Sequence, residues 1–119
     1  MAQDLVRRSG LFQAVTSRPS WQPLLDVYEL RDGWLIKADL AGVRPDEVSV
    51  SVRGREVTIS GLRRDHAVEE GCCHYRMEIS YSRFERTIEL PSDLGPATMQ
   101  SEFRDGMLLI RIRRRSPNS

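Results

Sequence analysis

The sequence predicts an all-β domain built as a sandwich of two antiparallel sheets. From Leu24 onward, apolar and polar residues alternate with a period of two, which is typical of strands with one buried face. Turn-forming residues recur about every 8 to 12 positions, a spacing typical of sandwiches. No long apolar stretch has a helical period, so the pattern favours sheets over helices.

The first hairpin is expected over residues 24–40. The stretches LLDVYEL and GWLIKADL flank Asp32-Gly33, a pair whose tolerance of positive φ suits a tight turn. In the second stretch, alternate residues form one apolar face that we expect to be buried: Trp34, Ile36, Ala38 and Leu40. Pro45 then ends the ladder, because it lacks the amide hydrogen that a central strand needs.

Four further strands follow the same alternation. VSVSV places Val48, Val50 and Val52 on one side, and Arg53-Gly54-Arg55 turns the chain into EVTISG, where Val57 and Ile59 alternate with polar residues. After the loop LPSDLGP, the segment MQSEF places Met99, Ser101 and Phe103 on one face. Asp105-Gly106 predicts another hairpin turn before MLLIRIR.

Two more alternating segments lie within residues 74–91. HYRMEISY has Tyr75, Met77, Ile79 and Tyr81 on one face, and RFERTIELP has Phe84, Arg86, Ile88 and Leu90. Arg86 is the charged member of an apolar row. It is either the rim of the core, with its stem buried and its head in water, or one half of a desolvated ion pair.

The chain of 119 residues fits a single domain. Residues 1–22 are expected to form a flexible arm whose apolar side chains are scattered: Leu5, Leu11, Phe12 and Val15. An isolated helix of that length is marginal in water, so the arm would order only against another surface. Residues 23–113 form the predicted domain, and residues 114–119 a short disordered tail.

Charge and hydropathy indicate a cytoplasmic protein. The 18 basic and 17 acidic residues nearly cancel, so no overall field favours nucleic acid or an anionic membrane. No apolar run approaches the roughly 20 residues of a spanning helix, and Arg7 and Arg8 interrupt the one candidate signal segment. The basic end RIRRRSPNS has no interleaved aromatic residues for stacking on bases, so we expect neither a nucleic-acid nor a membrane partner.

Cys72, Cys73 and His74 are the first candidate for chemistry. Adjacent α-carbons lie about 3.8 Å apart, which is too close for an ordinary disulfide, and a zinc site usually spaces its ligands and recruits a second pair. We therefore expect free thiols and no metal or cofactor. The pairs Asp46-Glu47 and Glu69-Glu70 sit in turns or charged loops where both carboxylates would be solvated. The sequence does not predict an enzyme.

The order of these segments resembles the small heat shock protein family and its α-crystallin domain. The matching pieces run from Pro23 to Ile112: PLLDVYE, WLIKADLAGV with DEVSV, TISGLR, YSRFERTIELP and SEFRDGMLLI. The resemblance implies an immunoglobulin-like antiparallel β-sandwich with a protruding strand-exchange loop. It also implies an ATP-independent chaperone that holds partly unfolded clients in solution.

The resemblance also implies functional residues. The segment from Cys72 to Ser80 would be the exchange loop, whose strand (Tyr75, Met77, Ile79) pairs with a partner's sandwich to form a homodimer. Arg86 would lie near that interface. Clients would bind the arm and, beyond it, the groove where the family's fourth and eighth core strands meet, which corresponds here to Val48, Val50 and Val52 on one side and Met99, Ser101 and Phe103 on the other.

The sequence departs from the family pattern in three places. Only RRRSPNS follows Ile112, without the family's isoleucine-x-isoleucine anchor, so a dimer or small oligomer is expected. Ser82 and Ser101 stand where the family more often has glycine and alanine, and the arm is short. The alternatives are a p23-like or CS-type adaptor, which lacks an exchange loop, and a redox sensor that uses Cys72 or Cys73.

Overall fold

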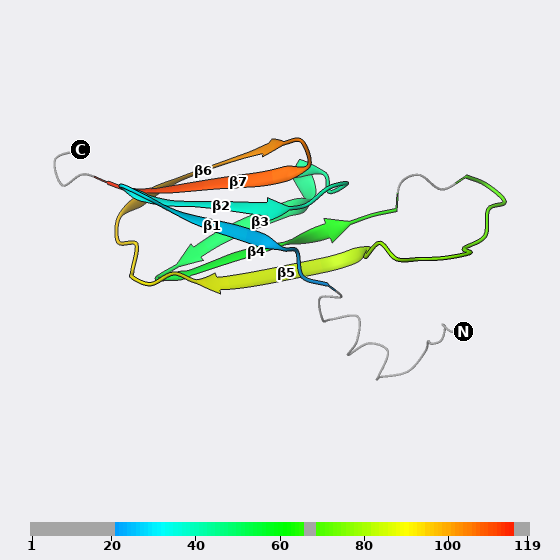
Figure 1. Ribbon diagram of the computed structural model, residues 1–119, viewed down its shortest axis with the longest axis horizontal. Helices are drawn as coiled ribbons and strands as arrows, with labels where there is room; N and C mark the ends of the chain where they lie inside the picture. Colours follow the sequence, from blue (N-terminus) through cyan, green and yellow to red (C-terminus); the bar gives the residue numbers. More distant parts are fainter. Residues whose placement is uncertain (1–20, 66–68, 116–119) are drawn as a thin grey trace.

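The described part of the chain forms two antiparallel sheets. The computed structural model describes residues 21–65 and 69–115. Within them lie seven strands and one 3-10 turn: β1 (Leu25–Leu30), β2 (Gly33–Asp39), η1 (Pro45–Glu47), β3 (Val48–Arg53), β4 (Glu56–Arg63), β5 (Ser82–Glu89), β6 (Ala97–Arg104) and β7 (Met107–Arg114). The predicted all-β sandwich is confirmed (Figure 1).

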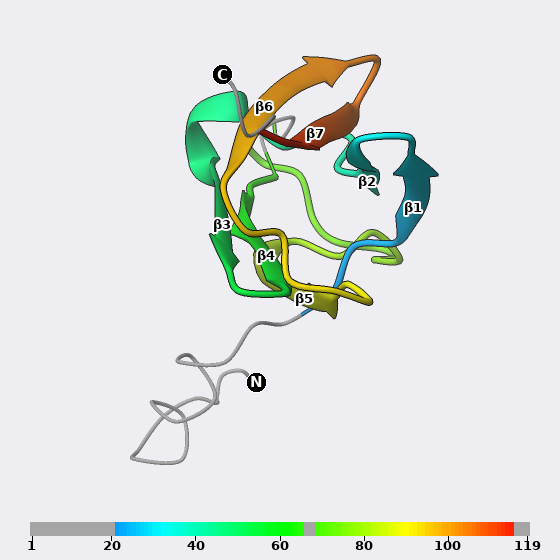
Figure 2. The same cartoon turned by 90° about the vertical axis from the view of Figure 1, so that its left-hand side faces the viewer.

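One sheet contains the first two and the last two strands of the chain, and the other contains the three strands between them. The first sheet has the order β1-β2-β7-β6, and the second has the order β3-β4-β5. Seen along the strands, the two sheets lie one above the other, with β6 and β3 along one side of the sandwich (Figure 2). β3 and β6 are both edge strands, so the sandwich is open between them.

The core lies between the two sheets and follows the period-two alternation of the sequence. β2 buries Trp34, Ile36 and Ala38, β7 buries Leu108, Ile110 and Ile112, and the second sheet contributes Val57, Ile59 and Phe84. Leu40, Val43, Leu90 and Leu94, which lie outside the strands, are buried in the same core. The predicted buried face of residues 34–40 is therefore confirmed.

The two predicted hairpin turns exist, but their glycines have different functions. Asp105 and Gly106 both have positive φ, 54° and 81°, as the pattern predicts. Gly33 does not lie in that region, and it begins β2 instead of forming the turn. A Cβ there would overlap the carbonyl oxygen of Ile112 on β7. Gly33 thus allows β2 and β7 to approach, a reason that differs from the predicted one.

Candidate functional site: an edge groove and a protruding loop

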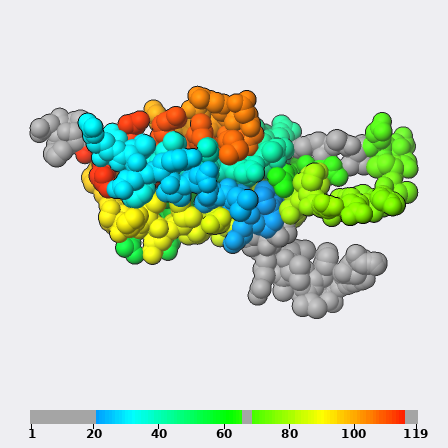
Figure 3. Space-filling view, viewed as in Figure 1, coloured from blue at the N-terminus to red at the C-terminus, as the bar shows by residue number. Residues whose placement is uncertain are grey.

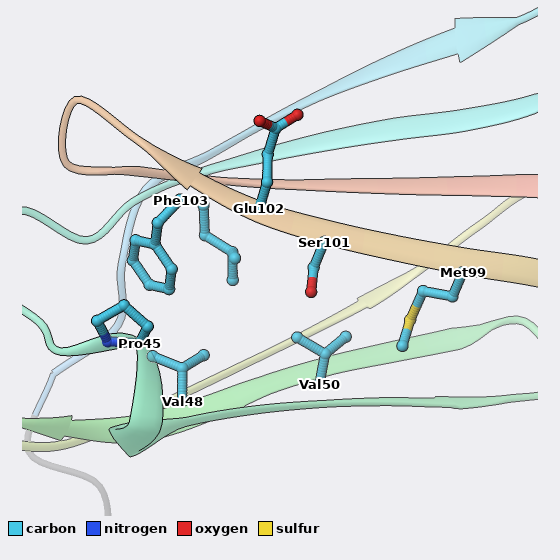
Figure 4. Close-up of a pocket in the computed structure, with 8 residues that line it drawn as sticks. Pro45, Val48, Val50, Met99, Ser101, Glu102 and Phe103 are labelled. Carbon is cyan, nitrogen blue, oxygen red and sulfur yellow. The ribbon is translucent and has the colours of Figure 1, made fainter.

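A groove runs between the edge strands β3 and β6. Its main hollow has a volume of about 440 Å³ and is lined by Pro45, Val48, Val50, Met99, Ser101, Glu102, Phe103 and Leu108. Val48 and Val50 point up from one strand, and Met99, Ser101 and Phe103 point down from the other (Figure 4). The structure thus brings these five predicted groove residues together.

Val52, the sixth predicted residue, lines a second hollow of about 270 Å³. Met99 borders both hollows, so they adjoin along the same side of the sandwich. The second hollow is also lined by Leu94, Ala97 and Ile112, with Asp93 at its border. Pro45 and Leu108 complete the first hollow, although the sequence did not single them out for the groove. Pro45 lies in η1, directly before β3, and Leu108 lies in β7, the neighbour of β6.

Glu102 borders the first hollow, but its carboxylate lies on the outer side of β6 (Figure 4). Glu102 points away from the hollow (Figure 4). It accepts a hydrogen bond of 2.8 Å from Arg111 and lies 3.2 Å from Arg104. The hydrogen bond from Arg111 lowers the pKa of Glu102, with the charge of Arg104 as the next cause. Two arginines therefore stabilise Glu102 as a carboxylate at the border of the groove.

Residues 69–81, which precede β5, extend away from the body of the sandwich as a protruding loop (Figures 1 and 3). Its apolar side chains face solvent: Tyr75 is 97%, Met77 52% and Ile79 62% exposed. The predicted strand at Tyr75–Ile79 is not formed in the single chain, because a strand needs a neighbouring edge for its backbone groups. Pairing of this segment with another chain stays a prediction.

The other predicted site residues have mixed outcomes. Arg86 is partly buried, and its Nη1 donates a 2.8 Å hydrogen bond to the carbonyl oxygen of Pro23. This geometry agrees with a rim arginine whose head is satisfied by the backbone. Cys72 and Cys73 are free and exposed, and the described residues contain no group of three or more potential metal ligands. Leu5, Leu11, Phe12 and Val15 lie outside the described residues.

The sequence missed a cluster where the loop meets the sandwich. Trp21, placed in the arm by its sequence context, packs on Phe84 with ring centroids 5.0 Å apart. The guanidinium of Arg63 lies 4.1 Å from the centre of the Trp21 ring. No local motif marks this contact, since Trp21, Arg63 and Phe84 are about 20 to 60 residues apart in the sequence.

Ser82 begins β5 with a φ of 86°, a conformation that favours glycine. A non-glycine residue there costs about 1 kcal/mol. We expect Ser82→Gly to raise the free energy of unfolding by roughly 0.5 to 1 kcal/mol, measured by urea denaturation. The same change in a regular strand, Ser49→Gly in β3, should lower it by about as much. Equal losses in both variants would contradict the strain at Ser82.

The fold, the groove and the loop together define a β-sandwich domain with two apolar surfaces that other chains can contact. The family model described as "Hsp20/alpha crystallin family" matches residues 26–119. The chain belongs to this family, that of the small heat shock proteins, and the resemblance stated from the sequence is confirmed.

Individual relatives agree with the family match. A heat shock protein of Dictyostelium discoideum is 34% identical over 92 residues, which cover 77% of this chain and 22% of that protein. Spore protein SP21 of Stigmatella aurantiaca is 29% identical over 97 residues, covering 82% and 57%. The chain thus spans less than two thirds of the length of either relative. The crystal structure of hspA from Xanthomonas axonopodis has a TM-score of 0.67 at 29% identity and covers 81% of this chain and 96% of that one.

Among the described residues there is no helix with the length and apolar character needed to cross a membrane.

Proposed function

We propose that this protein is an ATP-independent chaperone, a holdase that binds partly unfolded proteins and prevents their aggregation. The observation that carries the proposal is the open apolar groove between β3 and β6, in a chain of the small heat shock protein family. A protein that binds exposed apolar segments lowers the concentration of free aggregation-prone chains. Holding requires binding alone, without a reaction or a nucleotide.

The groove suits an extended apolar segment of a client. β3 offers Val48 and Val50 on one wall, and β6 offers Met99 and Phe103 on the other. Because both walls are edge strands, a bound segment can also meet unpaired backbone groups. The arm, with Leu5, Leu11, Phe12 and Val15, is the second proposed client surface.

We further propose that two chains form a homodimer by strand exchange. The segment Tyr75–Ile79 would pair with the outer edge of β1 on the partner, where Leu24, Val27 and Tyr28 are exposed. β1 pairs only with β2 among the described residues, so its other edge is available. Pairing there would cover both an exposed apolar row and an unpaired strand edge.

The proposed organisation is an arm (1–22), the sandwich (23–113) and a short tail (114–119). The proposed location is the cytoplasm. The p23-like adaptor is the alternative function. It predicts no protection of clients against aggregation, so one assay separates the two.

The direct test is to heat a thermolabile dehydrogenase with an equimolar amount of this protein and no nucleotide. We expect light scattering to be suppressed. Unchanged scattering at every ratio of the two proteins would refute the holdase and favour the adaptor.

A charge placed in the groove should reduce this protection. Val50→Asp puts a carboxylate among apolar walls, and burying a polar group without a partner costs about 2 kcal/mol, or about thirtyfold in client affinity. The matched control is Ser49→Asp, which adds the same charge to the exposed outer face of β3. Scattering assays with both variants, after circular dichroism shows that both are folded, measure the effect. Equal activity in the two variants would remove the groove from the mechanism.

A further inference from the structure

Trp21 and both ends of the connection between β4 and β5 lie at the same corner of the sandwich. β4 ends at Arg63 and β5 begins at Ser82, and these two residues are opposite one another in the ladder. Trp21, which precedes β1, forms a bridge with Phe84 two residues further along β5. The start of the domain and both ends of the protruding loop therefore meet here (Figure 1).

Arg63 contacts every part of this corner. Its guanidinium carbon lies 4.1 Å from the Trp21 ring centre and 5.8 Å from that of Tyr81. Its Nε donates a 2.8 Å hydrogen bond to the carbonyl oxygen of Ser80, and its Nη1 donates one of 3.0 Å to that of Ala41. The planar fork of arginine allows both hydrogen bonds while its face covers an aromatic ring.

Trp21 is held from the other side by β5. Its Nε1 donates a 3.2 Å hydrogen bond to the carbonyl oxygen of Ser82, and its own carbonyl accepts one of 3.4 Å from the amide of Glu85. Ser82, whose carbonyl oxygen accepts this indole hydrogen bond, is also the residue with a positive φ. The position of Trp21 and the backbone at the end of the loop are thus joined by direct contacts.

We propose that Arg63 is a positioning residue that couples the seating of Trp21 to the direction in which the loop leaves the sandwich. Arg63 holds Ser80 and Trp21 at once, so displacement of either one removes a contact that stabilises the other. Such a coupling is reciprocal by thermodynamic necessity. Any ligand or client that pulls the arm and unseats Trp21 would loosen the loop. The effect on dimer stability rests on the proposed strand exchange, whereas the coupling itself does not.

The test uses Trp21 as a fluorescent reporter. The chain has two tryptophans, and Trp34→Phe leaves Trp21 alone. Trp34 suits this change because its buried Nε1 has no hydrogen-bond partner among the described residues. In this background, Arg63→Met should shift the emission of Trp21 to longer wavelength. In the reciprocal experiment, Trp21→Leu should raise amide exchange at residues 80–82 about tenfold, the effect of losing one or two such contacts.

Arg55→Met is the matched control, because Arg55 makes an ion pair with Glu89 at the opposite end of β4 and β5. It should change neither the emission of Trp21 nor exchange at residues 80–82. The inference is overturned if Arg63→Met leaves the emission unchanged, or if Trp21→Leu leaves that exchange unchanged. If Arg63→Met does not fold, Arg63→Lys is judged by the same criteria, since lysine keeps the charge but cannot donate to both carbonyls through a planar fork.

The same variants separate this inference from the proposed dimer. Sedimentation gives the dissociation constant of each variant, and coupling predicts that Trp21→Leu and Arg63→Met each weaken a strand-exchanged dimer about tenfold. In the double variant the two effects should not add. If every variant and the parent are monomers, strand exchange fails while emission and amide exchange still decide the coupling. A dimer whose stability follows simple additivity overturns the coupling and leaves strand exchange standing.

Discussion

Removal of residues 72–80 is expected to convert the proposed strand-exchanged dimer to a monomer at micromolar concentration. The deletion takes away Tyr75, Met77 and Ile79, which are exposed in the single chain. Each such side chain contributes about 1.5 to 3 kcal/mol when it is buried, and the backbone hydrogen bonds of the exchanged strand add about 0.5 to 1.5 kcal/mol each. The loss of several kcal/mol raises the dissociation constant more than a thousandfold. Gel filtration with light scattering measures the particle mass.

The sandwich itself should survive this deletion. Arg63 and Ser82 are ladder partners, so residues 64–71 and 81 can still close the connection between β4 and β5. The full-length variant Tyr75→Ser/Met77→Ser/Ile79→Ser separates the apolar row from loop length and should also be monomeric. Cys72→Ser/Cys73→Ser is the control and should remain a dimer with full activity. A dimer in all three variants would show that the contact between chains lies elsewhere.

The fold could be predicted because alternation and turn chemistry act over short distances in the sequence. Val57 and Ile59 alternate with polar neighbours, and the structure buries both. Asp105 and Gly106 have the positive φ that their residue types favour. Local rules of this kind hold wherever one face of a strand packs on a core. Gly33 shows their limit, since its function depends on the approach of a strand from the other end of the chain.

The groove and the loop were accessible to sequence reasoning for a different reason. Val50 and Ser101 were placed in a groove by the order of motifs in a family, and the structure brings both to the same hollow. The family resemblance also predicts the exchange segment, and this stays a prediction because the single chain has no strand there. A strand that pairs with a second molecule has a sequence pattern but no partner in its own fold.

The contacts of single charged side chains were less predictable. The sequence allowed two interpretations of Arg86, the rim of the core or a desolvated ion pair. Only the position of the Pro23 carbonyl, which accepts its hydrogen bond, favours the rim. Arg63 gave no signal, because its partners are a ring and two carbonyl oxygens supplied by separate segments. Backbone carbonyls carry no residue type, so a sequence cannot mark them as partners.

A second large effect is expected at Gly61. This glycine lies in β4 between Val48 of β3 and Phe84 of β5. A Cβ at this position would overlap the carbonyl oxygen of Glu47 and lie 2.6 Å from Cζ of Phe84. The Glu47 carbonyl belongs to the backbone at the junction of η1 and β3, and it can move only if the sheet moves. Gly61→Ala should therefore lower the free energy of unfolding by about 2 to 4 kcal/mol.

Two comparisons separate steric overlap from the general cost of losing a glycine. Gly71→Ala adds the same methyl group where nothing lies within 4 Å, but at a φ of 85°, so it should lose only about 1 kcal/mol. Phe84→Leu removes the ring carbon that the new methyl group would meet. The double variant Gly61→Ala/Phe84→Leu should then be more stable than the sum of the single effects by about 1 kcal/mol.

Urea denaturation of these four variants and the parent measures each free energy. Because a domain of this size is stable by only about 5 to 15 kcal/mol, Gly61→Ala should also lower the melting temperature clearly. The Glu47 carbonyl remains in place in the double variant, so recovery should be partial. Strict additivity of the free energies of unfolding would mean that a Cβ at position 61 does not overlap Phe84. If Gly61→Ala loses no more free energy of unfolding than Gly71→Ala, then β4 moves easily away from β3.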